Sequence, residues 1–336
     1  MRHFSLKNPL VFGTVVLAIT GFVSRIIGFF YRIFLSRVFG AEGMGIYQLT
    51  APVLALTFAL SAAGIQTAIS KFVARETSTR DYRYSFVYLF SGLTLSLALS
   101  ILCAGFVYCF SEQIAVRFLM EDRTAPLLRI IALSIPMAAV HSCINGYFYG
   151  IKKTGIPSIC QLSEQLMRVG SVYVIYALCQ KRGYSPTISF AVIGLGIGEC
   201  ASMLVSLIAA WAHFSGKLNT SSASSNVPFH LHRALSDMLH LSIPLSANRV
   251  IINFLMSVEA VFIPAQLLRY GYAHQAALSI YGVLTGMSLP LILFPSAITG
   301  SVCVLLLPVV SEADAAGNQH IVEKAIQKSV KFGCRL

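Results

Sequence analysis

Residues 9–36, PLVFGTVVLAITGFVSRIIGFFYRIFLS, decide the fold class of this chain. A helix that crosses a bilayer needs about 20 consecutive, mainly apolar residues, and this stretch supplies them. Its start resembles a secretory signal peptide, but no small-residue cleavage site follows, and Arg25 and Arg32 continue the same helix. The stretch therefore predicts an uncleaved first membrane span.

Seven further stretches satisfy the same criterion, and the composition agrees with them. Of the 336 residues, 56% are hydrophobic and 11% are charged, and the mean hydropathy is +0.73. Soluble domains carry about 25% charged residues, so these values exclude a soluble protein and predict an all-α polytopic membrane protein. The additional predicted spans cover residues 45–72, 84–110, 126–150, 156–179, 187–213, 238–267 and 276–310.

The basic residues predict the orientation of these spans. The net charge is +12, but the chain has none of the aromatic-basic clusters of a nucleic-acid reader, so we expect the bilayer and not nucleic acid as the partner. Cytoplasmic loops are enriched in Lys and Arg. With the N-terminus inside, twelve basic residues fall in inner loops and six in outer loops. The inner set is Arg2, Lys7, Lys71, Arg75, Arg80, Arg83, Lys152, Lys153, Lys217, Arg233, Lys324 and Lys328, and the outer set is Arg37, Arg117, Arg123, Lys181, Arg182 and Arg269.

A polar segment divides the chain. Residues 214–237, FSGKLNTSSASSNVPFHLHRALSD, are rich in Ser and Asn and predict a cytoplasmic linker. Residues 1–213 then form an N-terminal six-helix lobe. Residues 238–336 start a second lobe with two spans and part of a third, so we expect a C-terminally truncated product. The first two predicted spans, which begin with the span of Arg25, and the seventh and eighth, which begin with the span of Arg249, share similar spacings, and this favours a parallel repeat such as transporters use.

Arginines inside the predicted spans are the first candidate site residues. Arg25 and Arg32 lie seven positions apart and so point the same way, together with Gly28 and Ser36. A charge in hydrocarbon costs roughly 2.5–3.5 kcal/mol and persists where it faces a cavity or a partner. The pattern favours a pocket for an anionic group; the alternative is that Arg32 reaches the membrane interface.

The span at 156–179 carries one polar stripe, formed by Gln161, Glu164, Gln165 and Arg168. Glu164 and Arg168 are spaced i, i+4 in the favourable order, so they form either a neutralised structural pair or part of a transport pathway. Glu199 lies among glycines that allow close helix packing, and is either a buried carboxyl or a coupling-ion group. Arg249 and Glu259 are further charged residues within the predicted spans and have the same two alternatives as Glu164 and Arg168. The weaker candidates, chosen as polar residues within spans, are Gln48, Gln66 and Asn145.

Three stretches resemble a known family. They are SRIIG at 24–28 followed by Arg32, RVFGAEGMGIYQ at 37–48, and AGIQTAISK at 63–71. Together with the stripe from Glu164 to Arg168, they are similar to the stage V sporulation protein B group of the multidrug/oligosaccharidyl-lipid/polysaccharide (MOP) superfamily. That superfamily also holds the lipid II flippases and the MATE (multidrug-and-toxin extrusion) transporters.

The resemblance implies two six-helix lobes around a central cavity, in the bacterial cytoplasmic membrane. It implies transport of an anionic, undecaprenyl-linked sugar by alternating access, driven by H⁺, Na⁺ or the membrane potential and without an organic cofactor or metal centre. By its Ser-Arg-x-x-Gly context, Arg25 matches a phosphate-binding arginine, while Arg32 is offset by one position and Arg249 corresponds through the repeat.

The predicted function is thus a flippase for a lipid-linked oligosaccharide or peptidoglycan-type precursor, with substrate contacts at Arg25, Arg32, Gln48, Asn145, Glu164, Arg168 and Arg249. Residues 71–83 would help to gate the inner mouth. The alternatives are a MATE-type cation antiporter, which should favour carboxylates over arginines, a membrane-embedded transferase, and a non-transporting fragment. The sequence has no phosphate-cradling Gly-Lys-Ser/Thr loop and no HExxH or GxSxG motif, so no enzyme is predicted. The oligomeric state is not predicted.

Overall fold

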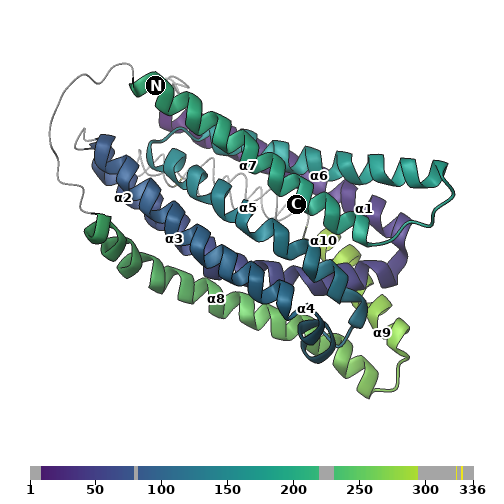
Figure 1. The fold of residues 1–336 in the computed structure, drawn as a ribbon. Helices are drawn as coiled ribbons and strands as arrows, with labels where there is room; N and C mark the ends of the chain where they lie inside the picture. Colours follow the sequence, from purple (N-terminus) through teal and green to yellow (C-terminus); the bar gives the residue numbers. More distant parts are fainter. Residues whose placement is uncertain (1–8, 79–81, 219–230, 294–322, 324–326, 328–336) are drawn as a thin grey trace.

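The computed structural model describes residues 9–78, 82–218 and 231–293, together with positions 323 and 327. The described residues form helices and no strands, which confirms the predicted all-α class. The long helices run roughly side by side in a bundle (Figure 1). Six of the described helices are long and apolar enough to cross a membrane, at Val15–Thr77, Ser85–Cys109, Asp122–Gly150, Ser189–Ser215, Ala234–Arg269 and His274–Ile292.

The first two predicted spans are joined differently from the prediction. Helix α1 runs over Pro9–Phe58 and is broken at Gly40, which has φ 71° and ψ −177°. The predicted connection at 37–44 is instead helical on both sides of that residue. Glycine adopts positive φ at little cost, so the chain turns within one residue. The second span then continues through a π-helical turn, η1 (Ala59–Ala63), into α2 (Gly64–Ser78).

The remaining N-terminal helices follow the predicted spans. They are α3 (Tyr82–Cys109), α5 (Ala125–Gly150), α6 (Gly155–Lys181) and α7 (Ser189–Leu218), with the short elements α4 (Ser111–Gln113), η2 (Ile114–Phe118) and η3 (Asp122–Thr124) between α3 and α5. Helix α6 is long enough to cross a bilayer but is not among the six apolar spans, since its polar stripe lowers its hydropathy.

The part of the chain predicted to start a second lobe, called the second lobe below, contains α8 (Leu231–Arg269), α9 (His274–Tyr281), η4 (Gly282–Ser288) and α10 (Leu289–Ile292). Helices α7 and α8 extend to residue 218 and from residue 231, so both ends of the segment predicted as a linker are helical. Residues 219–230, and the part of the last predicted span beyond residue 293, lie outside the described residues. Proline lies within α1, α5 and α8, where neighbouring helices can compensate for the lost backbone hydrogen bond.

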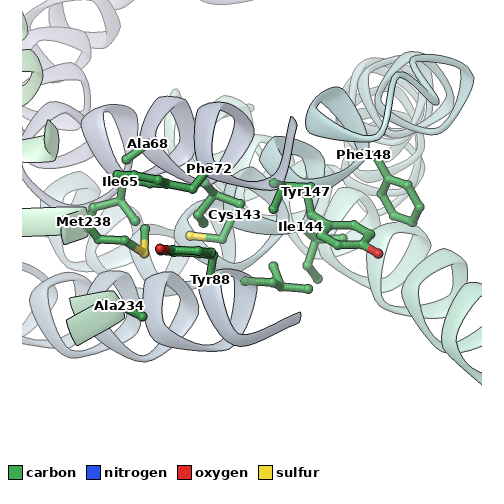
Figure 2. Packing of buried hydrophobic residues seen from close by; sticks show 13 residues of the cluster. Ile65, Ala68, Phe72, Tyr88, Cys143, Ile144, Tyr147, Phe148, Ala234 and Met238 are labelled. Carbon is green, nitrogen blue, oxygen red and sulfur yellow. The ribbon is translucent and has the colours of Figure 1, made fainter. Parts of the chain in front are cut away.

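Helix α5 is the centre of the N-terminal lobe and packs against α2, α3 and α7. One apolar cluster joins α2, α3, α5 and the start of α8, and Figure 2 shows Met238 and Ala234 of α8 beside Tyr88. Because Tyr147, Phe148 and Met238 are almost fully buried, removing one of these side chains would leave a cavity, at about 2–5 kcal/mol. The second lobe is therefore anchored on the core of the first.

Candidate functional site

The polar stripe of α6 supplies the first two members of a buried charge cluster. An ion pair joins Nη2 of Arg168 to Oε1 of Glu164, one turn apart on α6. Both side chains are about four-fifths covered by protein, with exposed fractions of 19% and 21%. The sequence left open whether this ion pair is purely structural or lines a transport pathway. The residues around the pair help to distinguish these two alternatives.

Helix α7 adds a second carboxylate, and α5 adds a histidine. Oε1 of Glu199 lies 3.6 Å from Nη2 of Arg168, and Oε2 of Glu199 lies 2.8 Å from Nε2 of His141. We call the four residues His141, Glu164, Arg168 and Glu199 the membrane cluster. It combines two carboxylates with one guanidinium and one imidazole, all within a single lobe.

Two glycines of α7 explain how Glu199 comes so close to α6. A Cβ on Gly198 would lie 2.8 Å from the backbone oxygen of Glu164, and one on Gly194 would lie 2.1 Å from Cγ2 of Val172. Neither position admits a side chain without a shift of its neighbours on α6. The glycines in GLGIGEC therefore allow the close packing that the sequence predicted, and this packing positions Glu199.

Helix α1 faces the same cluster. A Cβ on Gly28 would lie 3.1 Å from Nε2 of Gln165, so this face of α1 contacts the polar stripe. The side chains of Tyr31 and Tyr47 lie near enough to Arg168 to interact with it electrostatically. Tyr31 is only 6% exposed, so an aromatic hydroxyl enters the apolar interior beside the cluster.

Several polar atoms of this region have no hydrogen-bond partner among the described residues. They are the hydroxyl of Tyr31, Nε of Arg168 and Nδ1 of His141. Buried polar groups are normally satisfied, and exceptions indicate a place for water, an ion or a ligand. Two of these atoms belong to the cluster itself and the third to the helix that faces it, so each has hydrogen-bonding capacity left for water, an ion or a ligand group.

The other predicted site residues lie in different places. Arg25 and Arg32 of α1 and Arg249 of α8 are exposed, which in a spanning helix means that they are not covered by protein. Within the described ranges, no ion pair joins Arg32 or Arg249 to a carboxylate. The structure therefore brings Arg168 into the membrane cluster and does not bring these two arginines there. Glu259 is exposed on α8.

The predicted polar liners are buried or half-buried. Asn145 is 8% exposed, lies one turn from His141 on α5, and has no hydrogen-bond partner for Oδ1 among the described residues. Gln48 is 3.5 Å from the carbonyl oxygen of Thr285, between α1 and η4. Gln66 is half-buried at a close contact of α2 with α5, where a Cβ on Gly146 would lie 2.7 Å from its backbone oxygen.

His141 is the member of the membrane cluster that the sequence analysis missed. The sequence did mark this residue as a candidate, because a histidine within the predicted span 126–150 costs free energy in the bilayer unless it has a partner. Its partner lies 58 positions further along the chain, and no local pattern connects the two.

The cluster can hold a cation only at the expense of Arg168. Ligand atoms of His141, Glu164 and Glu199 lie within 4.8 Å of one another, and imidazole and carboxylate groups suit several metal ions. The guanidinium of Arg168, however, already pairs with both carboxylates. The arrangement thus fits two chemistries, an anion bound by Arg168 or a cation or proton bound by the carboxylates.

The predicted gate segment is tied to the second lobe. Its described residues are 71–78 in α2 and 82–83 in α3; residues 79–81 lie outside the described part. The guanidinium of Arg75 lies over the ring of Phe72, 5.1 Å from its centroid, and Nη2 donates to the hydroxyl of Tyr88 at 3.1 Å. That hydroxyl donates to Oδ2 of Asp237 in α8 at 3.3 Å.

Comparisons with known proteins agree with this architecture. The family described as polysaccharide biosynthesis protein matches residues 10–313. The chain is 28% identical to stage V sporulation protein B of Bacillus subtilis over 97% of its own length, and 21% identical to the lipid II flippase MurJ of the same organism, also over 97%. It spans 62% of the length of each of these two relatives.

Solved structures show the same fold. A MOP superfamily transporter from Pyrococcus furiosus superposes with a TM-score of 0.60 at 17% identity, covering 97% of this chain and 70% of that one. The inward-facing conformation of a multidrug resistance MATE family transporter gives a TM-score of 0.57 at 18% identity, covering 95% of this chain and 67% of that one. The apolar spans and the family match together identify a multi-pass membrane protein that belongs to the polysaccharide biosynthesis protein family and shares the fold of MOP superfamily transporters.

Proposed function

We propose that this chain acts in flipping a lipid-linked oligosaccharide or peptidoglycan-type precursor across the bacterial cytoplasmic membrane by alternating access. The observation that carries the proposal is the environment of the Arg168 side chain. Its guanidinium is buried in a spanning helix, pairs with Glu164 and Glu199, and keeps one N–H without a partner among the described residues. The named relatives include a lipid II flippase, which supports a substrate of this class.

The anionic part of such a substrate would compete with the carboxylates for Arg168. A pyrophosphate accepts two parallel hydrogen bonds from a guanidinium, which is the strongest geometry available to arginine. Glu164 would hold the arginine until the substrate arrives, and Asn145 would offer its amide one turn below His141. We keep four further residues as proposed substrate contacts during transport, because α1 belongs to the N-terminal lobe and α8 packs against it. They are Arg25, Arg32 and Gln48 of α1 and Arg249 of α8.

We propose in addition that a coupling ion, H⁺ or Na⁺, is exchanged at His141 and Glu199. When the substrate takes Arg168, both carboxylates lose their positive neighbour, and an ion bound there would compensate the charge. The predicted excess of basic residues on one side supports a cytoplasmic N-terminus for this mechanism. The mechanism makes and breaks no covalent bond, so the proposed activity is transport and not an enzyme reaction.

The direct test is binding of an undecaprenyl-pyrophosphate-linked sugar to the purified chain in lipid nanodiscs. The double variant E164Q/R168Q keeps the size of both side chains and the net charge, and we expect it to bind roughly tenfold more weakly than wild type. Arg182→Ala, an exposed arginine between α6 and α7, serves as the control and should bind like wild type. Equal affinity of wild type and E164Q/R168Q would refute the anion site.

A second function has one observation in its favour. Two carboxylates in one membrane cluster are also what a site for a lipophilic cation would contain. Tetraphenylphosphonium binding distinguishes the two cases. A cation transporter would bind it, and Glu199→Gln would abolish that binding, whereas the flippase proposed here should bind the pyrophosphate lipid and not the phosphonium.

A further inference from the structure

A second charge network joins the two lobes at one end of the molecule. It comprises Glu42 of α1, Glu121 and Arg123 of the connection between η2 and α5, and His274 and Gln275 of α9. We call these five residues the lobe latch. Figure 1 shows α4 and α9 at this end, opposite the end at which α8 begins. The first three residues belong to the N-terminal lobe, and the last two belong to the second lobe.

Glu121 is the centre of the lobe latch. Its side chain is 1% exposed. Nε of Arg123 donates to Oε1 at 2.6 Å, and Nη2 donates to Oε2 at 3.1 Å. Nε2 of His274 lies 2.8 Å from the same Oε2. The buried carboxylate is thus held from its own lobe and from the second lobe at once.

Glu42 makes a parallel link. Nη1 of Arg123 donates to its Oε1 at 2.7 Å, and Nε2 of Gln275 donates to its Oε2 at 2.7 Å. Each carboxylate is therefore bonded both to Arg123 in the first lobe and to one residue of α9 in the second. Two adjacent residues of α9 hold two carboxylates that lie 79 positions apart in the sequence.

The backbones of the two lobes also touch beside the lobe latch. A Cβ on Gly45 of α1 would lie 2.2 Å from the backbone oxygen of Leu278, and one on Gly282 would lie 2.1 Å from that of Ala41. Such a close approach leaves no space between α1 and the α9–η4 segment. This end is closed, and it cannot open without separating His274 and Gln275 from the carboxylates.

The opposite end is held in a different way. There α8 contacts α2 and α3 through Ala234 and Met238 in the apolar cluster and through the 3.3 Å hydrogen bond between Tyr88 and Asp237. Apolar contacts are insensitive to pH, whereas a histidine paired with a carboxylate is not. The two ends of the lobe interface thus differ in what can release them.

We propose that the lobe latch is a pH-sensitive closure of this end, in which protonation of His274 strengthens its contact with Glu121 and deprotonation lets the lobes separate. The proposal rests on the alternating access proposed above but not on the substrate. A charge-assisted hydrogen bond is about twice as strong as a neutral one, so the closed state gains from each proton bound at His274.

The charges that face His274 support this direction. From the N-terminal lobe these are Glu121 and Arg123, with Glu42 one contact further away. Burial alone raises the pKa of the Glu121 carboxyl, but the hydrogen bonds from Arg123 and His274 outweigh burial and lower the pKa to about 2. Glu121 is therefore ionised throughout the pH range of the test described below. In the second lobe, the nearest ionisable side chains in sequence are Arg269 at the end of α8, and Tyr270 and Tyr272 in the connection to α9. None of them has a hydrogen bond or ion pair with His274 among the described residues.

The test measures the separation of the lobes at this end as a function of pH. Spin labels attached to p-acetylphenylalanine in place of Arg117 and Tyr270, both exposed, report on the first and second lobe and leave the eight native cysteines unchanged. Double electron–electron resonance on the full chain in nanodiscs then gives the fraction with separated lobes. We expect this fraction to rise about two- to five-fold from pH 5.5 to pH 8 in wild type.

Three variants distinguish the lobe latch from a merely structural contact. His274→Gln keeps a hydrogen-bond donor without the charge, so its separated fraction should be the same at both pH values. His274→Ala should raise that fraction at both. Arg129→Gln removes the 2.7 Å ion pair with Glu112, which lies within one lobe, and should respond to pH like wild type.

A pH response that survives in His274→Gln would overturn the proposal. The proposal would also be overturned if every variant showed the same short distance between the two spin labels at every pH. In that case, removing the contact between His274 and Glu121 would not separate the lobes. The distance measurement uses no substrate, so a failure of the latch proposal is distinguishable from a failure of the flippase proposal.

Discussion

The membrane cluster and the lobe latch contain the same charged groups in different settings. Each has two glutamates, one arginine and one histidine, and in each the arginine pairs with both glutamates. In the membrane cluster all four residues come from one lobe, on α5, α6 and α7. In the lobe latch the histidine comes from the other lobe.

If both proposals hold, the position of the histidine decides what such a group of charges does. His141 and its carboxylate move together, because α5 and α7 are packed in one lobe, so its protonation changes charge and not contact between lobes. His274 and Glu121 separate if the lobes separate, so protonation there changes the conformation. The first arrangement suits binding and the second suits gating.

The largest expected effect tests whether the membrane cluster depends on its arginine. Arg168→Ala leaves Glu164 and Glu199 without their positive partner inside a spanning region, and we expect a loss of about 3–5 kcal/mol of stability. The midpoint of thermal unfolding in detergent measures this loss. The variant E164Q/R168Q should recover part of it, since position 164 then carries no charge and Glu199 keeps its contact with His141. If Arg168→Ala were as stable as wild type, the ion pairs would not matter to the fold.

Acid should weaken the lobe latch through Glu121. The pKa of this carboxyl is lowered from its ordinary value of 4.5 to about 2, so its contribution to stability is complete above about pH 4.5 and is lost as the pH falls toward about 2. We expect a loss of about 1–3 kcal/mol over that window, because Arg123 and His274 are half-exposed and their contributions are partly screened. Thermal unfolding at a series of pH values measures it.

The matched comparison is Glu121→Gln, which has no carboxylate to protonate at this position. Its unfolding midpoint should fall less steeply with acid than that of wild type between about pH 4.5 and 2. Parallel curves for the two proteins would mean that Glu121 is not held as the structure indicates.

Two glycines on one helix test the close packing that forms the membrane cluster. A Cβ on Gly198 meets the backbone of α6 at 2.8 Å, so Gly198→Ala should cost about 1–3 kcal/mol. Gly196 has open space around its Cβ position, so Gly196→Ala should be neutral or should stabilise by up to about 1 kcal/mol. Chemical denaturation of the two variants measures the difference, and a loss of equal size in both would argue against specific packing at Gly198.

The smallest effect is expected for the exposed pair between Glu112 and Arg129. It lies at the same end as the lobe latch but within one lobe, and the two side chains are 71% and 47% exposed. Arg129→Gln should change stability by less than about 0.5 kcal/mol. A larger change would show that exposed ion pairs at this end contribute more than the comparison assumes.

Much of the fold was predictable because a bilayer imposes simple requirements on a sequence. Each predicted span corresponds to a described helix or part of one, since apolar length alone identifies a span. The break at Gly40 was not predicted, because a single glycine with positive φ between two helical segments leaves no loop composition to detect.

The candidate site was predicted only where its spacing is local. Glu164 and Arg168 are one helical turn apart, so their pairing follows from the sequence. His141 and Glu199 are 58 positions apart, and His274 and Glu121 are 153 positions apart. Such pairs depend on how helices pack, which a single sequence does not specify.

The measurement that tests this account most directly is binding of an undecaprenyl-pyrophosphate-linked sugar to E164Q/R168Q and to His274→Gln, side by side with wild type in nanodiscs. We predict that the first variant binds roughly tenfold more weakly and that the second binds like wild type. That result would separate a binding cluster from a gating latch. Full binding by E164Q/R168Q, or a loss of equal size in both variants, would contradict the division of roles between the two clusters.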